Sequence, residues 1–378
     1  MNGTAETSCG GDNPAPFERV SVFGGGAWGS ALAIVSDSAG RRTRLWVREP
    51  DVVEQVRQNR MNRFLPQRSI PESIEVLGDL EAAARDADLA ILVIPSQFLR
   101  AQARQIGKLL AKNVPVVICS KGIETGSGKL MTQVVAEEMP GRPQAVLSGP
   151  SFAEEVALGQ PTAVTIATED AGELDGRLPD NLAGRLAMTL GTRNFRPYLS
   201  DDPVGAEVGG AVKNVLAIAC GIAAGHGLGS NPRAALITRG LAEIKRLSEA
   251  LGGRRETVTG LSGIGDLTLT CSSEQSRNFS FGKALASGLT PAQALEGKSA
   301  VVEGAVNARA VTELARRLGV EMPICAAVDA ILHRGLAIDE AIEQLLTRPI
   351  RAESRDLEPV LHLPHPEMEA AADTGAVA

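Results

Sequence analysis

A single lysine inside an otherwise apolar helical segment is the strongest candidate for chemistry in this sequence. Lys213 has Gly209, Gly210, Leu216 and Ala217 three and four positions away, so its amine rises from a stripe of small and apolar residues. Burial in such surroundings lowers the pKa of an ammonium group. A lysine with a lowered pKa can accept a proton near neutral pH, as the oxidation of an alcohol requires. The alternative is a lysine that extends to the surface of a helical bundle.

A glycine-rich segment near the N-terminus can bind the phosphates of a dinucleotide. The apolar run Val20–Phe23 leads directly into Gly24-Gly25-Gly26-Ala27-Trp28-Gly29, which places the pattern G-x-G-x-x-G between a predicted strand and a predicted helix. Gly24 permits the tight turn, Gly26 lets the pyrophosphate approach the backbone, and Gly29 lets helix and strand pack closely. The pyrophosphate then lies on free amides at the helix N-terminus. An ordinary glycine-rich turn is the alternative to this cofactor site of Gly24, Gly26, Trp28 and Gly29.

The end of the second predicted strand, Thr43–Val47, bears on which dinucleotide binds. Arg48 follows it directly, and an arginine here suits the 2′-phosphate of NADP, whereas an acid suits the ribose hydroxyls of NAD. Glu49 is adjacent and offers such an acid. The sequence therefore favours NADP modestly over NAD, with a solvated surface charge as the other explanation of Arg48.

Three further polar sites follow predicted elements. Lys121 comes after the run Val116–Cys119, at the carboxyl edge where parallel sheets bind ligands, although a loop lysine is often only solvated. The run Ser276-Arg277-Asn278 offers a forked cation with neighbouring donors, as a phosphate monoester requires. Ser151 and Glu154 have the spacing of a capping box at the start of a helix. Asp266 is the remaining candidate, and a helix cap or turn is its ordinary alternative role.

The pattern of apolar residues predicts a doubly wound α/β part followed by an all-α part. Strands are predicted at Val20–Phe23, Thr43–Val47, Ile74–Leu77, Leu89–Ile94, Val116–Cys119, Ala145–Leu147 and Val164–Ala167. Helices between them are predicted at Trp28–Ala39, Val52–Asn59, Leu99–Leu110 and Leu130–Glu138. Such alternation indicates a parallel sheet covered on both faces. The strand pattern stops at Pro203, so we expect loose tails at 1–17 and 351–378, a Rossmann domain at 18–203 and a helical substrate domain at 204–350.

Composition excludes several classes of protein. A net charge of −7 disfavours a nucleic-acid-binding protein, which needs a broad basic surface. Five scattered cysteines and four histidines have no metal-ligand or redox spacing, so we expect no metal and a reducing compartment. The N-terminal stretch has no apolar run typical of a signal peptide. The apolar segment Val204–Gly225 contains Glu207 and Lys213 and is predicted to be a buried helix rather than a membrane span.

The glycine loop and several later segments together resemble the bacterial-type NAD(P)-dependent glycerol-3-phosphate dehydrogenases. The similarity runs from about Arg19 to Arg351 and includes SKGIE (120–124), SGPSFAEEVA (148–157), GGAVKNVLAI (209–218), ITRGLAEI (237–244), GIGDLTLTCSSEQSRNFSFG (263–282) and VVEG (301–304). The resemblance implies a Rossmann domain followed by a helical domain, with the active site between them. It also implies reversible hydride transfer between glycerol 3-phosphate and dihydroxyacetone phosphate, which supplies glycerophospholipid synthesis. We expect a cytoplasmic enzyme, a homodimer, without membrane insertion or bound nucleic acid.

The same resemblance assigns roles to individual residues. Lys213 is the proton-accepting catalytic lysine. The implied substrate-binding residues are Lys121, Gly149, Ser151, Lys213, Asp266, Ser276, Arg277 and Asn278. The implied cofactor contacts beyond the glycine loop and Arg48 are Lys121, Ala153, Arg277, Val301 and Glu303. Asp266 is expected to orient either Lys213 or a substrate hydroxyl.

Two other functions are compatible with parts of the pattern. One is a related β-hydroxyacid dehydrogenase that acts on a carboxylate, which the combined SGPS, KN and SRN segments disfavour. The other is a non-catalytic protein that senses the cofactor, which the presence of Lys121, Lys213 and Asp266 disfavours.

Overall fold

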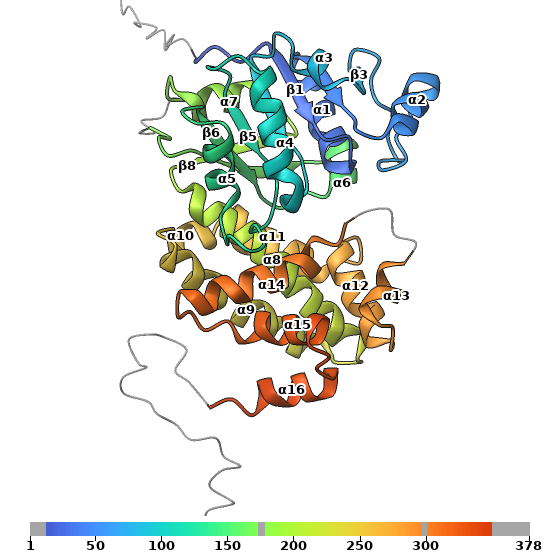
Figure 1. Ribbon diagram of the computed structural model, residues 1–378, viewed down its shortest axis with the longest axis vertical. Coiled ribbons are helices and arrows are strands. Elements are labelled where there is room, and N and C mark those ends of the chain that lie inside the picture. The colour runs from blue at the N-terminus through green and yellow to red at the C-terminus, as the bar shows by residue number, and fades with distance from the viewer. Residues whose placement is uncertain (1–12, 173–177, 297–300, 350–378) are drawn as a thin grey trace, which may run out of the picture.

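A computed structural model describes residues 13–172, 178–296 and 301–349, which divide into a sheet-based N-terminal part and a C-terminal part built from helices (Figure 1). The strands are β1 (Arg19–Phe23), β2 (Arg42–Trp46), β3 (Glu75–Leu77), β4 (Leu89–Leu92), β5 (Val116–Ile118), β6 (Gln144–Ser148), β7 (Thr162–Ala167) and β8 (Phe195–Ser200). The helices among them are α1 (Ala27–Ser38), α2 (Pro50–Asn59), α3 (Leu80–Ala84), α4 (Ser96–Leu109), α5 (Met131–Glu138), α6 (Ala153–Ala157) and α7 (Leu182–Leu190).

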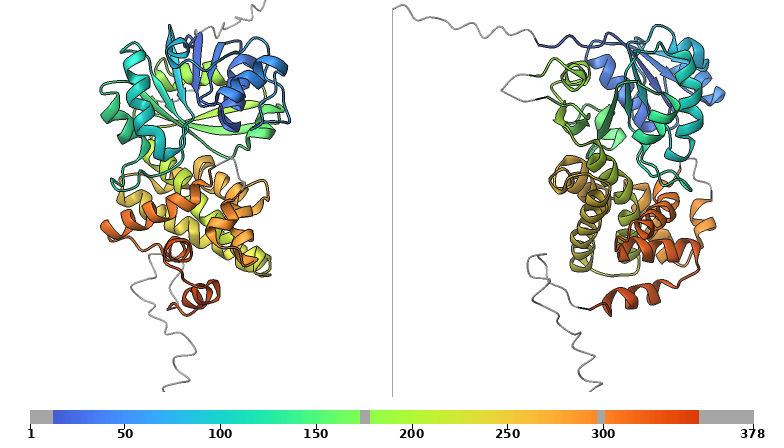
Figure 2. Two further views of the ribbon diagram at one scale, coloured as in Figure 1. Left: turned by 45° about the vertical axis from the view of Figure 1, so that its right-hand side comes forward. Right: turned by 60° about the vertical axis from the view of Figure 1, so that its left-hand side comes forward.

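The strands form one sheet in the order β3-β2-β1-β4-β5-β6-β7-β8. Apolar residues on both faces of the central strands pack against helices, with one core cluster under α1 and another under α4 and α5. Figures 1 and 2 show these helices on opposite sides of the sheet. The predicted doubly wound sheet is therefore confirmed, and the predicted strand and helix bounds lie within three residues of those observed.

The expectation of a wholly parallel sheet is wrong at one pair of strands. β6 and β7 pair antiparallel, with Leu147 opposite Ile166. The connection between them contains only the short helix α6, which packs against α1 instead of crossing the sheet, so the chain re-enters at the end it left. A parallel neighbour needs a crossover along the length of the sheet.

Two features of the N-terminal part have no counterpart in the predicted elements. β8 contains Pro197, which lacks a backbone donor and argues against a strand, but β8 is the last strand in the sheet order and pairs only with β7.

Residues 15–17, predicted to belong to a loose tail, are docked on α7. The Phe17 amide donates to Thr189 Oγ1 at 2.9 Å, and Arg185 stacks on the Phe17 ring. Of the predicted tails, residues 1–12 and 351–378 lie outside the described residues, as does residue 350 of the predicted helical domain.

The C-terminal part is arranged around one long buried helix. Its helices are α8 (Pro203–Gly225), α9 (Ser230–Ala250), α10 (Arg255–Val258), α11 (Asp266–Ser272), α12 (Arg277–Ala286), α13 (Pro291–Leu295), α14 (Glu303–Arg317), α15 (Pro323–His333) and α16 (Ile338–Leu346), with a π-helical turn at Leu261–Gly265 before α11. α8 contacts α9, α11, α12, α14 and α15.

Local sequence explains both the start of α8 and its close packing. Asp202 caps it by accepting from the Gly205 amide at 2.8 Å, and Pro203 occupies the first turn, where its missing amide costs nothing. A Cβ at Gly221 would collide with the backbone of α12. α8 is the one helix of the described chain whose length and hydropathy suit a membrane span. Of its most apolar 18-residue stretch, 83% is buried inside the protein. The prediction of a buried helix is confirmed.

Candidate functional site

A cavity of about 570 Å³ opens where the carboxyl end of the sheet meets α8, α11 and α12. Of the predicted site residues, Gly149 and Asp266 lie behind its wall, and all the others line it: Gly24, Gly26, Trp28, Gly29, Arg48, Lys121, Ser151, Ala153, Lys213, Ser276, Arg277, Asn278, Val301 and Glu303. These residues come from distant segments of the chain. Their convergence defines the candidate active site.

The glycine loop has the geometry that a pyrophosphate needs. Gly24 has a φ of +129°, and a Cβ there would collide with the Val93 carbonyl oxygen. A Cβ at Gly29 would collide with the Gly24 carbonyl, so this glycine permits the close strand–helix contact. Gly26 is the N-cap of α1 without a side-chain cap, and open space faces its Cα. Backbone amides at the start of α1 are therefore accessible to an anion. Trp28 Nε1 is buried and has no hydrogen-bond partner among the described residues, which leaves a donor at the same edge of the cavity.

Two lysines share one buried carboxylate beside this loop. Lys213 Nζ donates to Asp266 Oδ1 at 2.5 Å, and Lys121 Nζ donates to Asp266 Oδ2 at 2.7 Å. Asp266 is 1% exposed and Lys213 is 7% exposed, so α8 does not present Lys213 as a surface lysine. Asp266 is no helix cap either, because Gly265 occupies the N-cap of α11 and Asp266 accepts from both amines. Asp266 thus fixes the amine of Lys213 and that of Lys121 at one edge of the cavity.

The charges around Lys213 determine how readily it releases its proton. Burial lowers the pKa of Lys213 to about 8, with the Lys121 ammonium adding to this and the Asp266 carboxylate opposing it. Burial alone would raise the pKa of Asp266, but the two ammonium groups outweigh burial and hold this pKa below its usual value. The predicted lowering of the Lys213 pKa is confirmed in direction. Near neutral pH Lys213 can therefore both accept and donate a proton.

Thr270 is a site residue that sequence reasoning missed. Lys213 Nζ donates to Thr270 Oγ1 at 2.9 Å, and Thr270 lines the cavity. Thr270 follows Asp266 by four positions on α11, so both side chains lie on one face of that helix. That i, i+4 spacing is the signal that identifies it once Asp266 is a candidate.

The segment Ser276-Arg277-Asn278 begins α12 at the cavity wall. Ser276 is the N-cap, and its hydroxyl oxygen accepts from the Phe279 amide at 3.3 Å. Arg277 is exposed in the first turn with its guanidinium available to a ligand. Asn278 is buried, donates to Asn214 Oδ1 at 3.0 Å and accepts from the Gly304 amide at 2.9 Å, so it joins α8 to α14. One amide hydrogen of Asn278 remains for a ligand, because an asparagine has two.

Glu303 brings a carboxyl group to the same wall. Burial raises its pKa, while the charges of Arg277, Lys121 and Lys213 oppose that rise. Asn214 Nδ2 donates to Glu303 Oε2 at 3.4 Å. Val301, two residues earlier, is 43% exposed at the cavity mouth.

The loop after β6 contributes backbone rather than a helix cap. The carbonyl of Gly149 accepts from Lys121 Nζ at 3.4 Å and from Ser151 Oγ at 3.0 Å. Capping, the ordinary alternative role of Ser151, is not what the structure has, because α6 begins at Ala153 with Phe152 as its N-cap. The Ser151 hydroxyl instead faces the cavity next to Lys121, and Ala153 begins α6.

Arg48 and Glu49 lie together at the other end of the cavity. Arg48 Nη2 donates to Glu49 Oε1 at 2.8 Å, and the Arg48 side chain is 64% exposed. The structure thus places a cation and an acid side by side where the second strand ends. An arginine here suits a 2′-phosphate, and an acid suits the ribose hydroxyls.

The sequence comparisons agree with this geometry. Family models described as the N-terminus and the C-terminus of NAD-dependent glycerol-3-phosphate dehydrogenase match residues 19–173 and 202–343. The chain belongs to this family. A glycerol-3-phosphate dehydrogenase [NAD(P)+] of Rhodospirillum rubrum is 51% identical over 89% of this chain and 94% of its own length. One of Caulobacter vibrioides is 52% identical over 89% of this chain and 99% of its own length.

Solved structures of the family have the same fold. A crystal structure of glycerol-3-phosphate dehydrogenase from Coxiella burnetii aligns with a TM-score of 0.82 at 39% identity, covering 88% of this chain and 99% of that one. The enzyme from Saccharomyces cerevisiae aligns with a TM-score of 0.74 at 27% identity, covering 87% of this chain and 99% of that one. The Rossmann-like fold with a helical C-terminal domain is therefore that of the dehydrogenase family.

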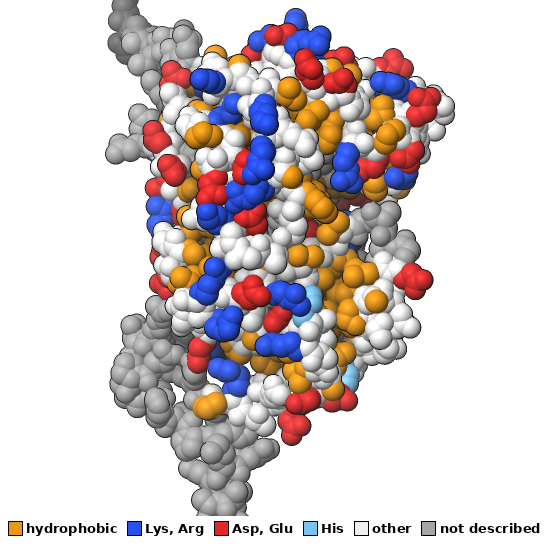
Figure 3. All heavy atoms as spheres, in the orientation of Figure 1, with side chains coloured by type: hydrophobic (Ala, Val, Ile, Leu, Met, Phe, Trp, Pro, Cys, Tyr) orange, Lys and Arg blue, Asp and Glu red, His pale blue; other side chains and the backbone are white. Residues whose placement is uncertain are grey.

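A larger and mostly apolar cavity of about 1330 Å³ lies elsewhere, between α9, α15 and α16. It contains neither the glycine loop nor the two lysines, so it has no part in the candidate active site. In Figure 3, acidic and basic side chains are interspersed over the face shown, without a large patch of one sign.

Proposed function

We propose that this chain catalyses reversible hydride transfer between sn-glycerol 3-phosphate and dihydroxyacetone phosphate, with NADP or NAD as cofactor. The observation that carries the proposal is the shared carboxylate of Asp266, which fixes Lys213 and Lys121 beside a dinucleotide-type glycine loop. The similar proteins named above are NAD(P)-dependent glycerol-3-phosphate dehydrogenases. Turnover of dihydroxyacetone phosphate with NADPH and with NADH tests the proposal. Faster turnover of β-hydroxyacids would favour the carboxylate dehydrogenase instead. Cofactor binding without any turnover would contradict an enzymatic function.

The protein residues of the site bind, orient and exchange a proton. The nicotinamide, when bound, supplies or accepts the hydride. Gly24, Gly26 and Trp28 would hold the dinucleotide at the start of α1. In the oxidation direction the neutral amine of Lys213 takes the hydroxyl proton of the substrate, and in reduction its ammonium returns a proton to the carbonyl oxygen. Lys121 stabilises negative charge on that oxygen from the opposite side of Asp266.

The substrate phosphate requires its own site, because a protein with a net charge of −7 provides little general attraction for an anion. Arg277 in the first turn of α12 offers a planar fork of donors next to the positive end of a helix dipole. We expect Arg277→Lys to raise KM for glycerol 3-phosphate and Arg277→Ala to raise it further, by roughly 10- to 100-fold for a lost charge-assisted contact. Steady-state kinetics of both variants measure this.

Unphosphorylated glycerol is the control for Arg277. The native enzyme should use it very poorly, since binding of the remote phosphate helps to place the reacting carbon. Its weak turnover should barely change in Arg277→Ala. An equal loss with glycerol and with glycerol 3-phosphate would mean that Arg277 acts on the chemistry or the cofactor instead.

Arg48 is expected to set the preference for NADP. Arg48→Ala should weaken NADPH binding more than NADH binding, by about 1.5 kcal/mol, which is the low end for a charge-assisted contact because Arg48 is mostly exposed and paired with Glu49. Fluorescence titration with each cofactor measures the difference. Arg42→Ala, an exposed arginine at the other end of β2, is the matched control. Equal weakening of both cofactors by Arg48→Ala would rule out recognition of the 2′-phosphate.

Cytoplasmic localisation, a homodimeric state and a supply of glycerol 3-phosphate to glycerophospholipid synthesis complete the proposed function. Among the described residues, α8 is the one helix apolar and long enough for a membrane span, and its burial inside the protein supports a protein that works without membrane insertion. Light scattering on the purified chain tests the homodimer.

A further inference from the structure

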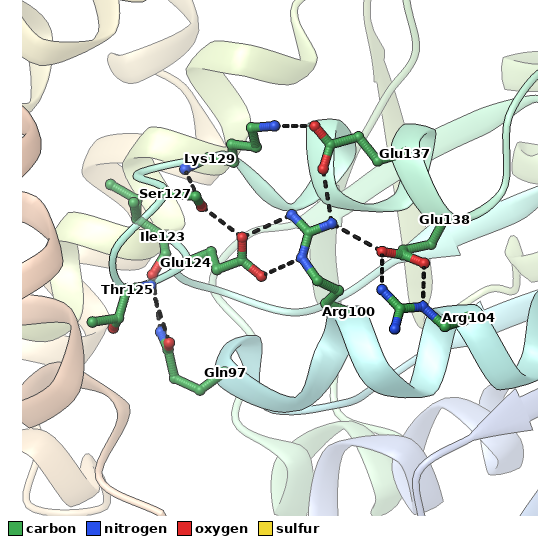
Figure 4. Close-up of polar contacts among 10 residues, drawn as sticks. All are labelled: Gln97, Arg100, Arg104, Ile123, Glu124, Thr125, Ser127, Lys129, Glu137 and Glu138. Carbon is green, nitrogen blue, oxygen red and sulfur yellow. Dashed lines mark hydrogen bonds and ion pairs between the residues drawn. The ribbon is translucent and has the colours of Figure 1, made fainter.

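The loop that carries Lys121 is held by an arginine that lies outside the cavity. This loop, residues 119–130 between β5 and α5, is here called the Lys121 loop. Figure 4 shows Arg100 of α4 at the centre of a polar network that joins the loop to α5. Arg100 does not line the active-site cavity, and its contacts are with carboxylates.

Arg100 binds the Lys121 loop through two parallel hydrogen bonds to one carboxylate. Arg100 Nε and Nη2 donate to Glu124 Oε1 and Oε2, each at 2.8 Å. The other arm of the guanidinium, Nη1, donates to Glu137 and Glu138 on α5 at 2.8 and 2.9 Å. The Glu124 side chain is 16% exposed, and its hydrogen bonds with Arg100 hold its pKa below the usual value. A forked arginine–carboxylate pair fixes orientation as well as distance.

A glutamine one turn earlier on α4 grips the same loop by its backbone. Gln97 Nε2 donates to the Ile123 carbonyl at 2.9 Å, and the Thr125 amide donates to Gln97 Oε1 at 3.1 Å. Within the loop, the Glu124 amide donates to the Lys129 carbonyl at 2.9 Å. α4 therefore holds residues 123–125, two to four positions beyond Lys121, through side chain and backbone together.

The helical part holds the loop from the other side. Asn307 of α14 donates to the Lys121 carbonyl at 3.1 Å, and Arg317 of α14 donates to the Ser127 carbonyl at 3.1 Å. The loop thus lies between the two parts of the protein. Contacts with α4 on the sheet side and with α14 on the helical side together hold it in place.

Lys121 needs such a restraint, because two ammonium groups face one carboxylate. Lys121 and Lys213 repel each other across Asp266, and Lys121 is the more exposed of the two, at 16% against 9% of the side chain. A loosened loop would let Lys121 move toward solvent, where its charge is hydrated. We propose that Arg100 is a positioning residue that clamps Glu124 and thereby holds Lys121 against Asp266 in the active site.

The clamp has a consequence for the titration of Lys213. The charged and titratable groups that face Lys213 are Asp266 and the neutral Cys271 thiol on α11, Lys121 on the loop and Glu303 on α14. The positive charge of Lys121 lowers the pKa of Lys213, so withdrawal of Lys121 raises that pKa. Loss of the clamp should therefore move the rise of glycerol 3-phosphate oxidation to higher pH. A defect in helix packing alone would lower the activity without moving the pH profile.

The inference rests on the proposed function and is tested with variants of the full chain. Arg100→Gln should lower kcat/KM for dihydroxyacetone phosphate by roughly 10- to 100-fold, the usual result of a small misplacement in an active site. Arg100→Lys keeps the positive charge but loses the forked geometry, so its kcat/KM should lie between those of Arg100→Gln and the native protein. Arg104→Gln is the matched control, since Arg104 lies one turn along α4 and pairs with Glu138 but not with Glu124. It should retain native kinetics and the native pH profile.

A double variant separates the clamp from the rest of the proposed function. Because Arg100 acts through Lys121, adding Arg100→Gln to Lys121→Ala should cause no further loss beyond about twofold. An equal loss in both backgrounds, or an Arg100→Gln variant with native kinetics beside an impaired Lys121→Ala, would overturn the clamp and leave the proposed function intact. Native turnover in Lys121→Ala would overturn the role of Lys121 and the clamp together. If Arg100→Gln does not fold, Arg100→Lys and Glu124→Gln carry the same test.

Discussion

Lys213→Ala should lower kcat by roughly 10²- to 10⁴-fold, the usual contribution of a positioned acid–base group, while the cofactor still binds. The fold should tolerate this change, because Asp266 keeps its ion pair with Lys121 and is not left as an unpaired buried charge. Pre-steady-state reduction of the nicotinamide measures the chemical step, and fluorescence titration measures cofactor binding. Lys283→Ala, which removes a partly exposed lysine of α12 outside the cavity, is the control for loss of a positive charge.

The same variant offers a second readout that a purely structural lysine would not give. Truncation to alanine removes the amine and leaves Thr270 and Asp266 without that partner in a buried site. A small primary amine added to the assay should restore part of the activity. The restored rate should vary with the pKa of the added amine, because the amine then takes part in the proton transfer. Near-native turnover of a folded Lys213→Ala protein would remove Lys213 from the mechanism.

Local pattern was sufficient to predict seven of the eight strands and the buried helix that carries Lys213. The stripe of small residues around Lys213 indicated a buried amine, and the structure places it at 7% exposure with a lowered pKa. The glycine loop was recognisable because a strand precedes it and a helix follows it. In both cases the physical cause lies within a few residues of the group itself.

Contacts between distant segments were beyond the reach of local pattern. Asp266 lies 145 residues from Lys121 and 53 from Lys213 along the chain, and no spacing rule indicates that one carboxylate binds both amines. The sequence left open whether Asp266 orients Lys213 or a substrate hydroxyl. Its buried position between the two lysines supports the first role.

The errors also have local physical reasons. β8 was missed because Pro197 argues against a strand, yet an edge strand can tolerate the missing donor. The ordinary capping role of Ser151 does not apply either, since Ser151 bonds back to the Gly149 carbonyl and the helix starts at Ala153. Arg100 was not a candidate at all, because its importance depends on the tertiary contact with Glu124.

Asp266→Asn should slow the reaction by roughly 10- to 10³-fold and, unlike the loss of Arg100, should move its pH profile to lower pH. The carboxylate raises the pKa of Lys213, so a neutral amide of the same size lets that pKa fall further below about 8. The Lys213 amine is then neutral over a wider pH range, but the carboxylate no longer orients it. The reaction is slower because of this loss of orientation. The pH dependence of kcat/KM for glycerol 3-phosphate oxidation measures both effects.

The stability of Asp266→Asn provides the decisive control, because the buried Lys213 and the partly buried Lys121 ammonium groups then share no counterion. Breaking a buried ion pair costs about 3–5 kcal/mol at neutral pH. A lysine whose pKa is lower in the folded state than in the unfolded chain destabilises the fold, and this penalty is full below the folded pKa and decreases as pH rises from the folded pKa toward the unfolded value. The deficit in unfolding free energy relative to the native chain should therefore shrink as pH rises from the lowered Lys213 pKa toward about 8. Asp329→Asn, a buried aspartate paired with Arg334 on α15, is the matched substitution. A deficit of Asp266→Asn that stays constant with pH would mean that the carboxylate is a packing element and does not set the charge state of Lys213.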